Sequence, residues 1–129
     1  MRILIADDDH NLRYSFQRSL EGRGYDFIEA ADGEEAIEMV RREAPDVVVM
    51  DITMPGLNGI EATRQILTEW PGIKVVALSM HSDEQFVEEM LEAGASGYLL
   101  KDCALEELSR AIRSAVAGQS YLSPGIAGI

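Results

Sequence analysis

Charged side chains stand directly after three short apolar runs of the chain. They are Asp7 and Asp8 after residues 3–6, Asp51 after residues 47–50, and Lys101 after residues 97–100. In an open parallel sheet, ligands bind in the crevice beyond the carboxyl ends of the strands, so residues at those ends converge from distant parts of the sequence. Three neighbouring carboxylates repel one another unless a cation joins them. The placement therefore predicts a cation-binding site.

The first of these turns contains no glycine between residues 6 and 11. A nucleotide site would need glycines there, because backbone amides must approach the phosphates closely. Carboxylates instead attract a hard divalent cation such as Mg²⁺ (or Mn²⁺), which takes one or two carboxylates together with water and phosphate oxygens. The pair alone has a simpler interpretation, because Asp8 or Asp9 could serve only as a helix N-cap.

Asp51 adds a possible nucleophile to the acidic pair. It precedes a loop fixed by Pro55 and Gly56, and a carboxylate can attack phosphorus to give an aspartyl phosphate. Such a transfer requires cations and hydrogen-bond donors on the phosphoryl oxygens. Lys101 supplies a point charge and Ser79, which follows residues 75–78, a hydroxyl. Alone they would be an exposed lysine and a turn residue; together with three acids they predict metal-assisted phosphoryl transfer to Asp51.

Five short apolar segments alternate with amphipathic stretches along the chain. The segments lie near residues 2–6, 25–30, 46–50, 74–78 and 96–100. This alternation predicts an α/β domain in which helices cover both faces of a parallel sheet. Asn58 is placed to cap the third helix, and Gly94 and Gly118 stand where helices commonly end in a left-handed residue.

Composition is that of one soluble domain of 129 residues, 47% hydrophobic and 26% charged. No apolar run approaches the roughly 18 residues of a membrane span, and no secretory signal precedes the first strand, so we expect no membrane association and a cytoplasmic location. Cys103 is the only cysteine, which excludes an intrachain disulfide. The net charge of −12 disfavours DNA binding by this chain alone.

The motifs together resemble the receiver domain of two-component response regulators over essentially the whole chain. They lie at residues 3–8, 50–59, 77–79 and 94–101. The resemblance implies a flavodoxin-like (CheY-like) sheet of five parallel strands in the order 2-1-3-4-5, with five flanking helices. It also implies that Asp51 accepts a phosphoryl group from the phosphohistidine of a sensor histidine kinase, and that the chain is not a turnover enzyme.

The same resemblance assigns roles to other residues. Asp7 and Asp8 would hold Mg²⁺ (or Mn²⁺), helped by Asp51 and the backbone carbonyl of Thr53, while Ser79 and Lys101 would contact the phosphate. Ser79 and Tyr98 would form the switch, with Tyr98 turning inward and the face of the fourth helix, fifth strand and fifth helix changing shape. Without the family, Tyr98 would be interpreted as a half-buried strand tyrosine with a hydrated hydroxyl.

Two further positions are assigned by their spacing in the family. Thr53 and His81 each lie two residues beyond a site residue, where receivers tune the rate at which water removes the phosphate. Histidine is the residue type whose ordinary titration range is near neutral pH, so a dependence of the phosphate lifetime on pH through His81 is a further implication of the resemblance. The simpler interpretation of His81 is a loop histidine facing solvent.

Residues 59–66, 99–102 and 121–124 resemble the NarL or FixJ subgroup, whose output is a LuxR-type helix-turn-helix domain. This resemblance implies a receiver over residues 1–118 and, over residues 119–129, the start of a linker toward a C-terminal DNA-binding domain absent from the chain. DNA would be bound only through that domain. A phosphorylation-dependent homodimer is expected by the same analogy.

Two departures from the family pattern stand out. Asp102 follows the lysine where many receivers have proline, so a cis peptide bond is not expected there. Asp9 and His10 occupy positions where subgroup members more often have histidine then proline, and we interpret Asp9 as a helix cap.

Two other functions fit part of the pattern. A phosphatase of the haloacid dehalogenase type also uses an aspartate nucleophile, a lysine and an acidic pair, but that family places the nucleophile first and a second Asp two residues later, where this chain has Thr53. A receiver-like module that only dimerises is the second alternative. Such modules usually lack one of the five site residues, whereas this chain has Asp7, Asp8, Asp51, Ser79 and Lys101.

Overall fold

The computed structural model describes residues 1–80, 84–102 and 104–124. Six strands alternate with five helices. The strands are β1 (Arg2–Ala6), β2 (Asp26–Ala30), β3 (Val47–Asp51), β4 (Lys74–Ser79), β5 (Gly97–Leu100) and β6 (Tyr121–Leu122). The helices are α1 (His10–Ser19), α2 (Gly33–Glu43), α3 (Gly59–Glu69), α4 (Glu84–Glu92) and α5 (Ala104–Val116).

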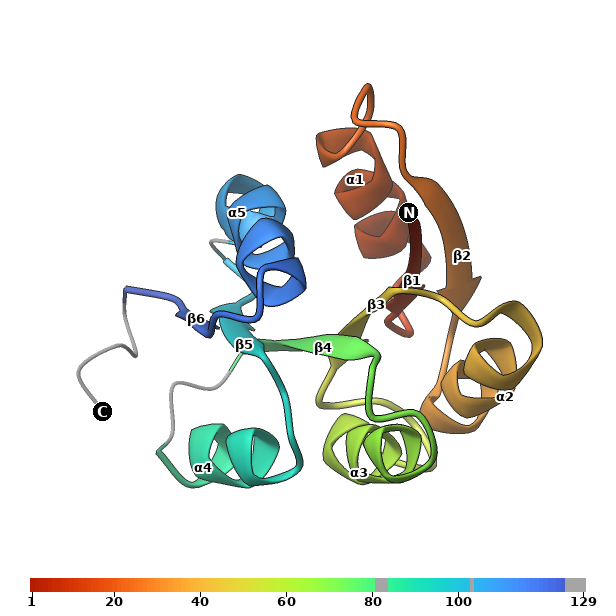
Figure 1. The fold of residues 1–129 in the computed structure, drawn as a ribbon, viewed down its shortest axis with the longest axis vertical. Helices are drawn as coiled ribbons and strands as arrows, with labels where there is room; N and C mark the ends of the chain where they lie inside the picture. The colour runs from red at the N-terminus through yellow and green to blue at the C-terminus, as the bar shows by residue number, and fades with distance from the viewer. Residues whose placement is uncertain (81–83, 103, 125–129) are drawn as a thin grey trace.

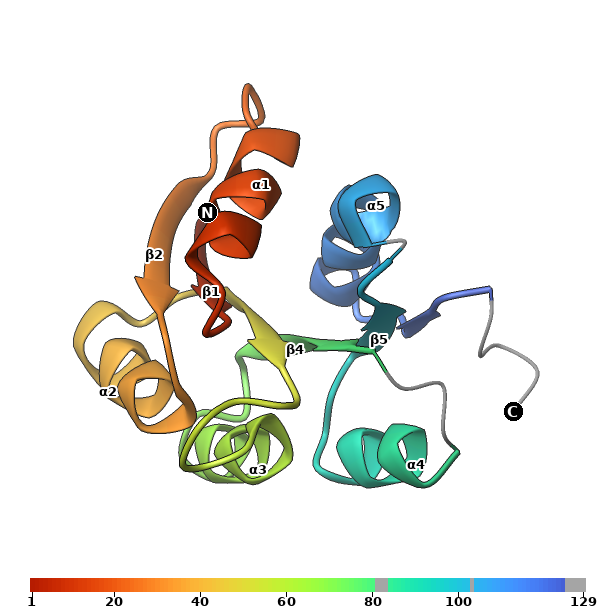
Figure 2. The same cartoon turned by 180° about the vertical axis from the view of Figure 1, so that it is seen from behind.

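The strands form one parallel sheet in the order β2-β1-β3-β4-β5-β6. Helices α1 and α5 cover one face, and α2, α3 and α4 cover the other (Figures 1 and 2). Strands β1 and β3 are buried from Ile3 and Val47 onward, because helices lie over both of their faces. The flavodoxin-like arrangement is confirmed.

The prediction of a five-stranded sheet was wrong, because Tyr121–Leu122 adds a sixth strand beside β5. Tyr121 packs against the core on the α5 face, whereas Leu122 packs against the core on the α4 face. Two residues flanked by small and turn-forming residues are too few to show the alternation of apolar and polar residues that predicts a strand, so the sequence pattern could not reveal β6. It lies within the range predicted as the start of a linker.

Helix termini agree with the predicted signals. The Asn58 side chain accepts a hydrogen bond from the backbone amide of Glu61 at 2.9 Å and caps α3. Gly94 and Gly118 adopt φ values of 108° and 80°, in the left-handed region that a side chain disfavours. No peptide bond of the described residues is cis, so the bond between Lys101 and Asp102 is trans.

Within the part of the chain that the structure describes, every helix is too short or too polar to cross a membrane.

Candidate functional site

Asp7 and Asp8 emerge from the buried end of β1. Asp7 is fully buried, and its Oδ1 accepts a hydrogen bond from the backbone amide of Asp9 at 2.9 Å, whereas Asp8 is exposed. Asp9 caps α1 by accepting from the amides of Asn11 and Leu12. The interpretation of Asp9 as a cap is confirmed, and the cap fixes the turn that carries the acidic pair.

Asp51 is the last residue of β3 and is 1% exposed. Its Oδ1 accepts a hydrogen bond from the backbone amide of Thr53 at 3.2 Å. The following loop returns tightly, since the amide of Gly59 donates to the carbonyl of Ile52 at 2.9 Å. The first residue of α3, Gly59, therefore lies against the backbone of Asp51 and Ile52.

Gly59 is required by this close approach. A Cβ at Gly59 would lie 2.1 Å from the carbonyl oxygen of Asp51, whereas one at Gly72 would meet nothing within 4 Å. We expect Gly59→Ala to lower the free energy of unfolding by about 1–3 kcal/mol, because the loop behind Asp51 must shift. Urea unfolding would measure this loss. Gly72→Ala is the matched control, and equal effects of the two substitutions would contradict the steric argument.

Lys101 joins the two buried carboxylates. Its Nζ lies 3.1 Å from Asp7 Oδ2 and 3.1 Å from Asp51 Oδ2. The lysine follows β5, and its backbone amide donates to the carbonyl of Ser79 at 2.8 Å. Ser79 is itself buried at the end of β4. The carboxyl ends of β1, β3, β4 and β5, consecutive strands in the sheet, thus bring the predicted residues together.

The electrostatics of this group favour a bound cation. Burial raises the pKa of Asp51 to about 6, and the charge of Asp7 adds to this shift, although Lys101 opposes it. Burial alone would lower the pKa of Lys101, but Asp51 and Asp7 outweigh burial, so its pKa is raised. A single lysine therefore compensates the buried negative charge only in part.

The donor set fits Mg²⁺ or Mn²⁺. One carboxylate oxygen from each of Asp7, Asp8 and Asp51 can be chosen so that all three lie within 4.8 Å of one another. Asp7 Oδ2 and Asp51 Oδ2 are buried and accept no hydrogen bond within the described residues, although both face Lys101. Oxygen atoms left with spare acceptor capacity in an acidic cluster are the ligands that hard divalent cations take.

The remaining predicted residues lie around this cluster. Thr53 is exposed at the rim. Tyr98 lies on β5 in register with Ala77 and is fully buried, so the interpretation of a half-buried tyrosine was wrong. The core beneath α4 encloses it. His81 and Cys103 lie outside the described residues.

Arg13 is a supporting residue that the sequence did not reveal. From α1, its Nη1 donates to the backbone carbonyl of Asp7 at 2.5 Å and its Nε pairs with Glu29 at 2.8 Å. The contact ties the acidic turn to α1 and β2. An arginine in the second turn of a helix carries no sequence signal for such a role, because its target is a backbone atom.

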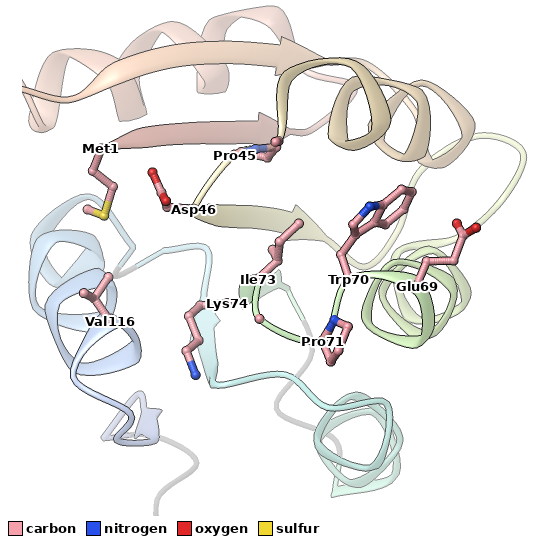
Figure 3. A pocket seen from close by; sticks show the side chains of 11 residues that line it. Met1, Pro45, Asp46, Glu69, Trp70, Pro71, Ile73, Lys74 and Val116 are labelled. Atoms are coloured by element: carbon pink, nitrogen blue, oxygen red, sulfur yellow. The ribbon is translucent and has the colours of Figure 1, made fainter.

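A pocket of about 800 Å³ lies at the amino ends of the strands, on the opposite side of the sheet from the carboxyl ends that carry this cluster. Met1, Asp46, Trp70, Lys74 and Val116 are among the residues around it (Figure 3). It borders the amino ends of β3 and β4 and includes none of the predicted site residues.

The fold and this cluster define a class of protein: a flavodoxin-like α/β domain whose acidic site, with one lysine, lies beyond the carboxyl ends of the central strands. The chain belongs to the response regulator receiver domain family, whose family model matches residues 3–113. It is therefore a receiver domain of two-component response regulators. This membership does not support the phosphatase alternative.

Curated relatives place the chain in the NarL/FixJ subgroup. It is 43% identical to the response regulator GacA of Pseudomonas viridiflava, covering 98% of this chain and 60% of that relative. It is 39% identical to the response regulator UvrY of Escherichia coli K12, covering 98% of this chain and 59% of that relative. The chain thus spans about 60% of the length of these relatives.

One solved structure agrees with this placement, and a second agrees with the fold. A two-component response regulator of the LuxR family from Aurantimonas sp. SI85-9A1 superposes with a TM-score of 0.92 at 42% identity, covering 98% of this chain and 92% of that one. The isolated receiver domain of RcsB from Salmonella enterica gives a TM-score of 0.90 at 22% identity, covering 99% and 96%. The second match supports the fold alone.

Proposed function

We propose that Asp51 is the phosphoacceptor of this receiver domain and that a sensor histidine kinase is its donor. One observation carries the proposal. The buried Asp51 carboxylate ends the central strand β3 and faces Lys101 beside an acidic pair, in a chain of the receiver family. These are the groups that transfer of a phosphoryl group to a carboxylate requires.

In the proposed step, a carboxylate oxygen of Asp51 forms a bond to phosphorus while the bond from phosphorus to the donor imidazole nitrogen breaks. The imidazole leaves with the electron pair of that bond and takes up a proton. Lys101 Nζ, 3.1 Å from Asp51 Oδ2, is placed to contact an oxygen of the attached phosphoryl group, and the Ser79 hydroxyl is proposed as a second donor.

The carboxylates of Asp7, Asp8 and Asp51, together with the backbone carbonyl of Thr53, are proposed to hold Mg²⁺ (or Mn²⁺). When bound, the cation supplies positive charge that neutralises the phosphoryl oxygens and the clustered carboxylates. Asp9 and Arg13 position the acidic turn through the contacts described above. Thr53 and His81 remain predicted to tune the loss of the phosphoryl group.

The phosphorylated product would stay attached to the chain, so we propose that the domain acts as a signalling protein and not as a turnover enzyme. A location in the cytoplasm is proposed with it. Ser79 and Tyr98 are proposed to form its switch. Residues 1–118 would form the receiver and residues 119–129 would begin the linker toward a LuxR-type DNA-binding domain. GacA and UvrY are named response regulators, and the Aurantimonas protein a LuxR-family one. A phosphorylation-dependent homodimer is proposed by analogy with the receiver family.

Intact-mass spectrometry tests the phosphoacceptor directly. After incubation with a small acyl-phosphate donor, the wild-type chain should gain one phosphoryl group in the presence of Mg²⁺ and none in EDTA. Asp51→Ala should gain none, whereas Asp26→Ala, at an exposed position on β2, should behave as wild type. A folded wild-type chain that gains no phosphoryl group from any donor would favour an interaction domain independent of phosphorylation.

A further inference from the structure

The chain beyond α5 is hydrogen-bonded along β5. The backbone amide of Tyr121 donates to the carbonyl of Ser96 at 3.0 Å, and that of Ser123 donates to the carbonyl of Tyr98 at 3.0 Å. The amide of Leu100 in turn donates to Ser123 Oγ at 3.1 Å. These bonds follow β5 past Tyr98 to the residue before Lys101, and Figure 1 shows β6 beside β5.

A buried carboxylate on α5 anchors the same segment. Glu107 is 8% exposed, and its Oε1 accepts a hydrogen bond from the Tyr121 hydroxyl at 2.7 Å. Its Oε2 lies 3.4 Å from Ser123 Oγ. Burial and the bond to Glu107 raise the pKa of Tyr121, so the phenol remains protonated and able to donate. A buried carboxylate is costly without such donors, so Glu107 favours the docked segment.

Side-chain packing joins this segment to Tyr98. Leu122 is the register partner of Tyr98, and it packs against the core cluster that contains Tyr98. Gly97 allows the approach, because a Cβ there would lie 3.1 Å from the carbonyl oxygen of Tyr121. The strand that leads into Lys101 is thus held on its outer edge by residues 121–123, which we call the β6 clasp.

We propose that the β6 clasp carries the state of the phosphoacceptor site to the chain beyond α5, and that phosphorylation of Asp51 strengthens its docking on β5. The inference rests on the proposed function of Asp51. The connection is short, because Lys101 contacts Asp51 through its side chain and adjoins Leu100, whose amide binds the clasp.

The sign follows from charge. A phosphoryl group adds negative charge and acceptor oxygens at the point that Lys101 already contacts, so Lys101 is held more firmly in the position seen here. The end of β5 is then fixed in the arrangement that binds the clasp. By linkage, docking of the clasp favours the phosphorylated state to the same extent.

Hydrogen exchange at the amides of Tyr121 and Ser123 tests the inference, because the first donates to the carbonyl of Ser96, immediately before β5, and the second to that of Tyr98 on β5. With Mg²⁺ and a small acyl-phosphate donor, exchange at these two amides should slow about threefold or more in the wild-type chain. Unchanged or faster exchange in a chain shown by mass to be phosphorylated would overturn the inference.

Tyr121→Phe removes the hydroxyl donor of the anchor while keeping the ring, whereas Glu107→Gln removes the negative charge of the anchor while keeping an acceptor oxygen. In Tyr121→Phe we expect exchange at the amides of residues 121 and 123, measured without the acyl-phosphate donor, to rise about tenfold, which corresponds to the loss of one hydrogen bond to a charged group. In Glu107→Gln we expect a smaller rise at the same amides, because a hydrogen bond to a neutral acceptor is weaker. Tyr14→Phe, at an exposed tyrosine of α1, is the matched control and should leave exchange unchanged. Equal exchange in Tyr121→Phe and Tyr14→Phe would overturn the clasp.

The two proposals fail differently. If the wild-type chain gains no phosphoryl group by mass, the proposed function of Asp51 fails and with it the link to the clasp. If the chain is phosphorylated and Tyr121→Phe shows the expected faster exchange, but the donor does not slow exchange in the wild type, only the proposed signal through β6 fails.

Discussion

Lys101→Met is expected to lower the free energy of unfolding by about 3–5 kcal/mol at pH 7.5 in EDTA, the usual cost of removing one partner from a buried ion pair. The substitution leaves Asp7 Oδ2 and Asp51 Oδ2 buried without the ammonium group that lies 3.1 Å from each. Methionine keeps most of the side-chain volume, so the loss reports charge and not a cavity. The pKa of Asp51 should rise further in the variant, because Lys101 lowers it in the wild type.

Urea unfolding at two pH values and with a divalent cation separates this effect from lost packing. The loss should shrink at pH 5, where the Asp51 carboxyl takes up a proton, and should shrink at pH 7.5 when Mg²⁺ supplies the missing charge. Lys74, the other lysine of the chain, lies at the beginning of β4, and Lys74→Met serves as the control. A loss that is the same at both pH values and unaffected by Mg²⁺ would argue against an electrostatic origin.

The site was predictable because its residues combine unusual types with a fixed position in the fold. Asp51 and Lys101 follow apolar runs that could be read as strands, and the carboxyl ends of parallel strands meet at one edge of the sheet. The predicted helix ends at Asn58, which caps α3, and at Gly94, which follows α4 with a positive φ, were also confirmed, because each depends on one residue type at a fixed place. Such signals are local, so one sequence suffices to find them.

The features that escaped prediction depend on contacts between distant segments. The strand β6 exists because Tyr121 and Leu122 find partners on β5, not because two residues carry a strand pattern. Arg13 reaches the Asp7 carbonyl, and any residue can offer a carbonyl. Glu107 looks like a surface acid in the first turn of a helix until the chain beyond that helix folds back over it.

Asp51→Asn is expected to act in the opposite direction to Lys101→Met and to stabilise the metal-free protein at neutral pH. The pKa of Asp51 is about 6 in the folded state, against an ordinary value of 3.8. Between these values the folded state binds more protons at this group than the unfolded state does. Its contribution to the free energy of unfolding therefore falls as pH rises from about 4 to about 6, and stays low above that.

The neutral amide of the Asn variant lacks this dependence. In EDTA the gain in the free energy of unfolding should be near zero at pH 4 and should reach at most about 3 kcal/mol at pH 7.5, the equivalent of two pKa units. Asp26→Asn, at an exposed position on β2, should show no comparable gain. Unfolding by urea at a series of pH values measures both variants against the wild type.

Addition of Mg²⁺ should reduce or reverse the gain of Asp51→Asn, because the proposed cation site binds the ionised carboxylate of the wild type and loses that ligand in the variant. The wild type would then be stabilised by the cation more than the variant, and the difference should grow with the Mg²⁺ concentration. A gain that is the same at pH 4 and pH 7.5 would mean that charge burial at Asp51 is not its cause. A gain that Mg²⁺ leaves unchanged would mean that Asp51 is not a ligand of the cation. The pH dependence of the free energy of unfolding thus reports the cost of burying the charge of Asp51, and its Mg²⁺ dependence reports the use of Asp51 in binding a cation.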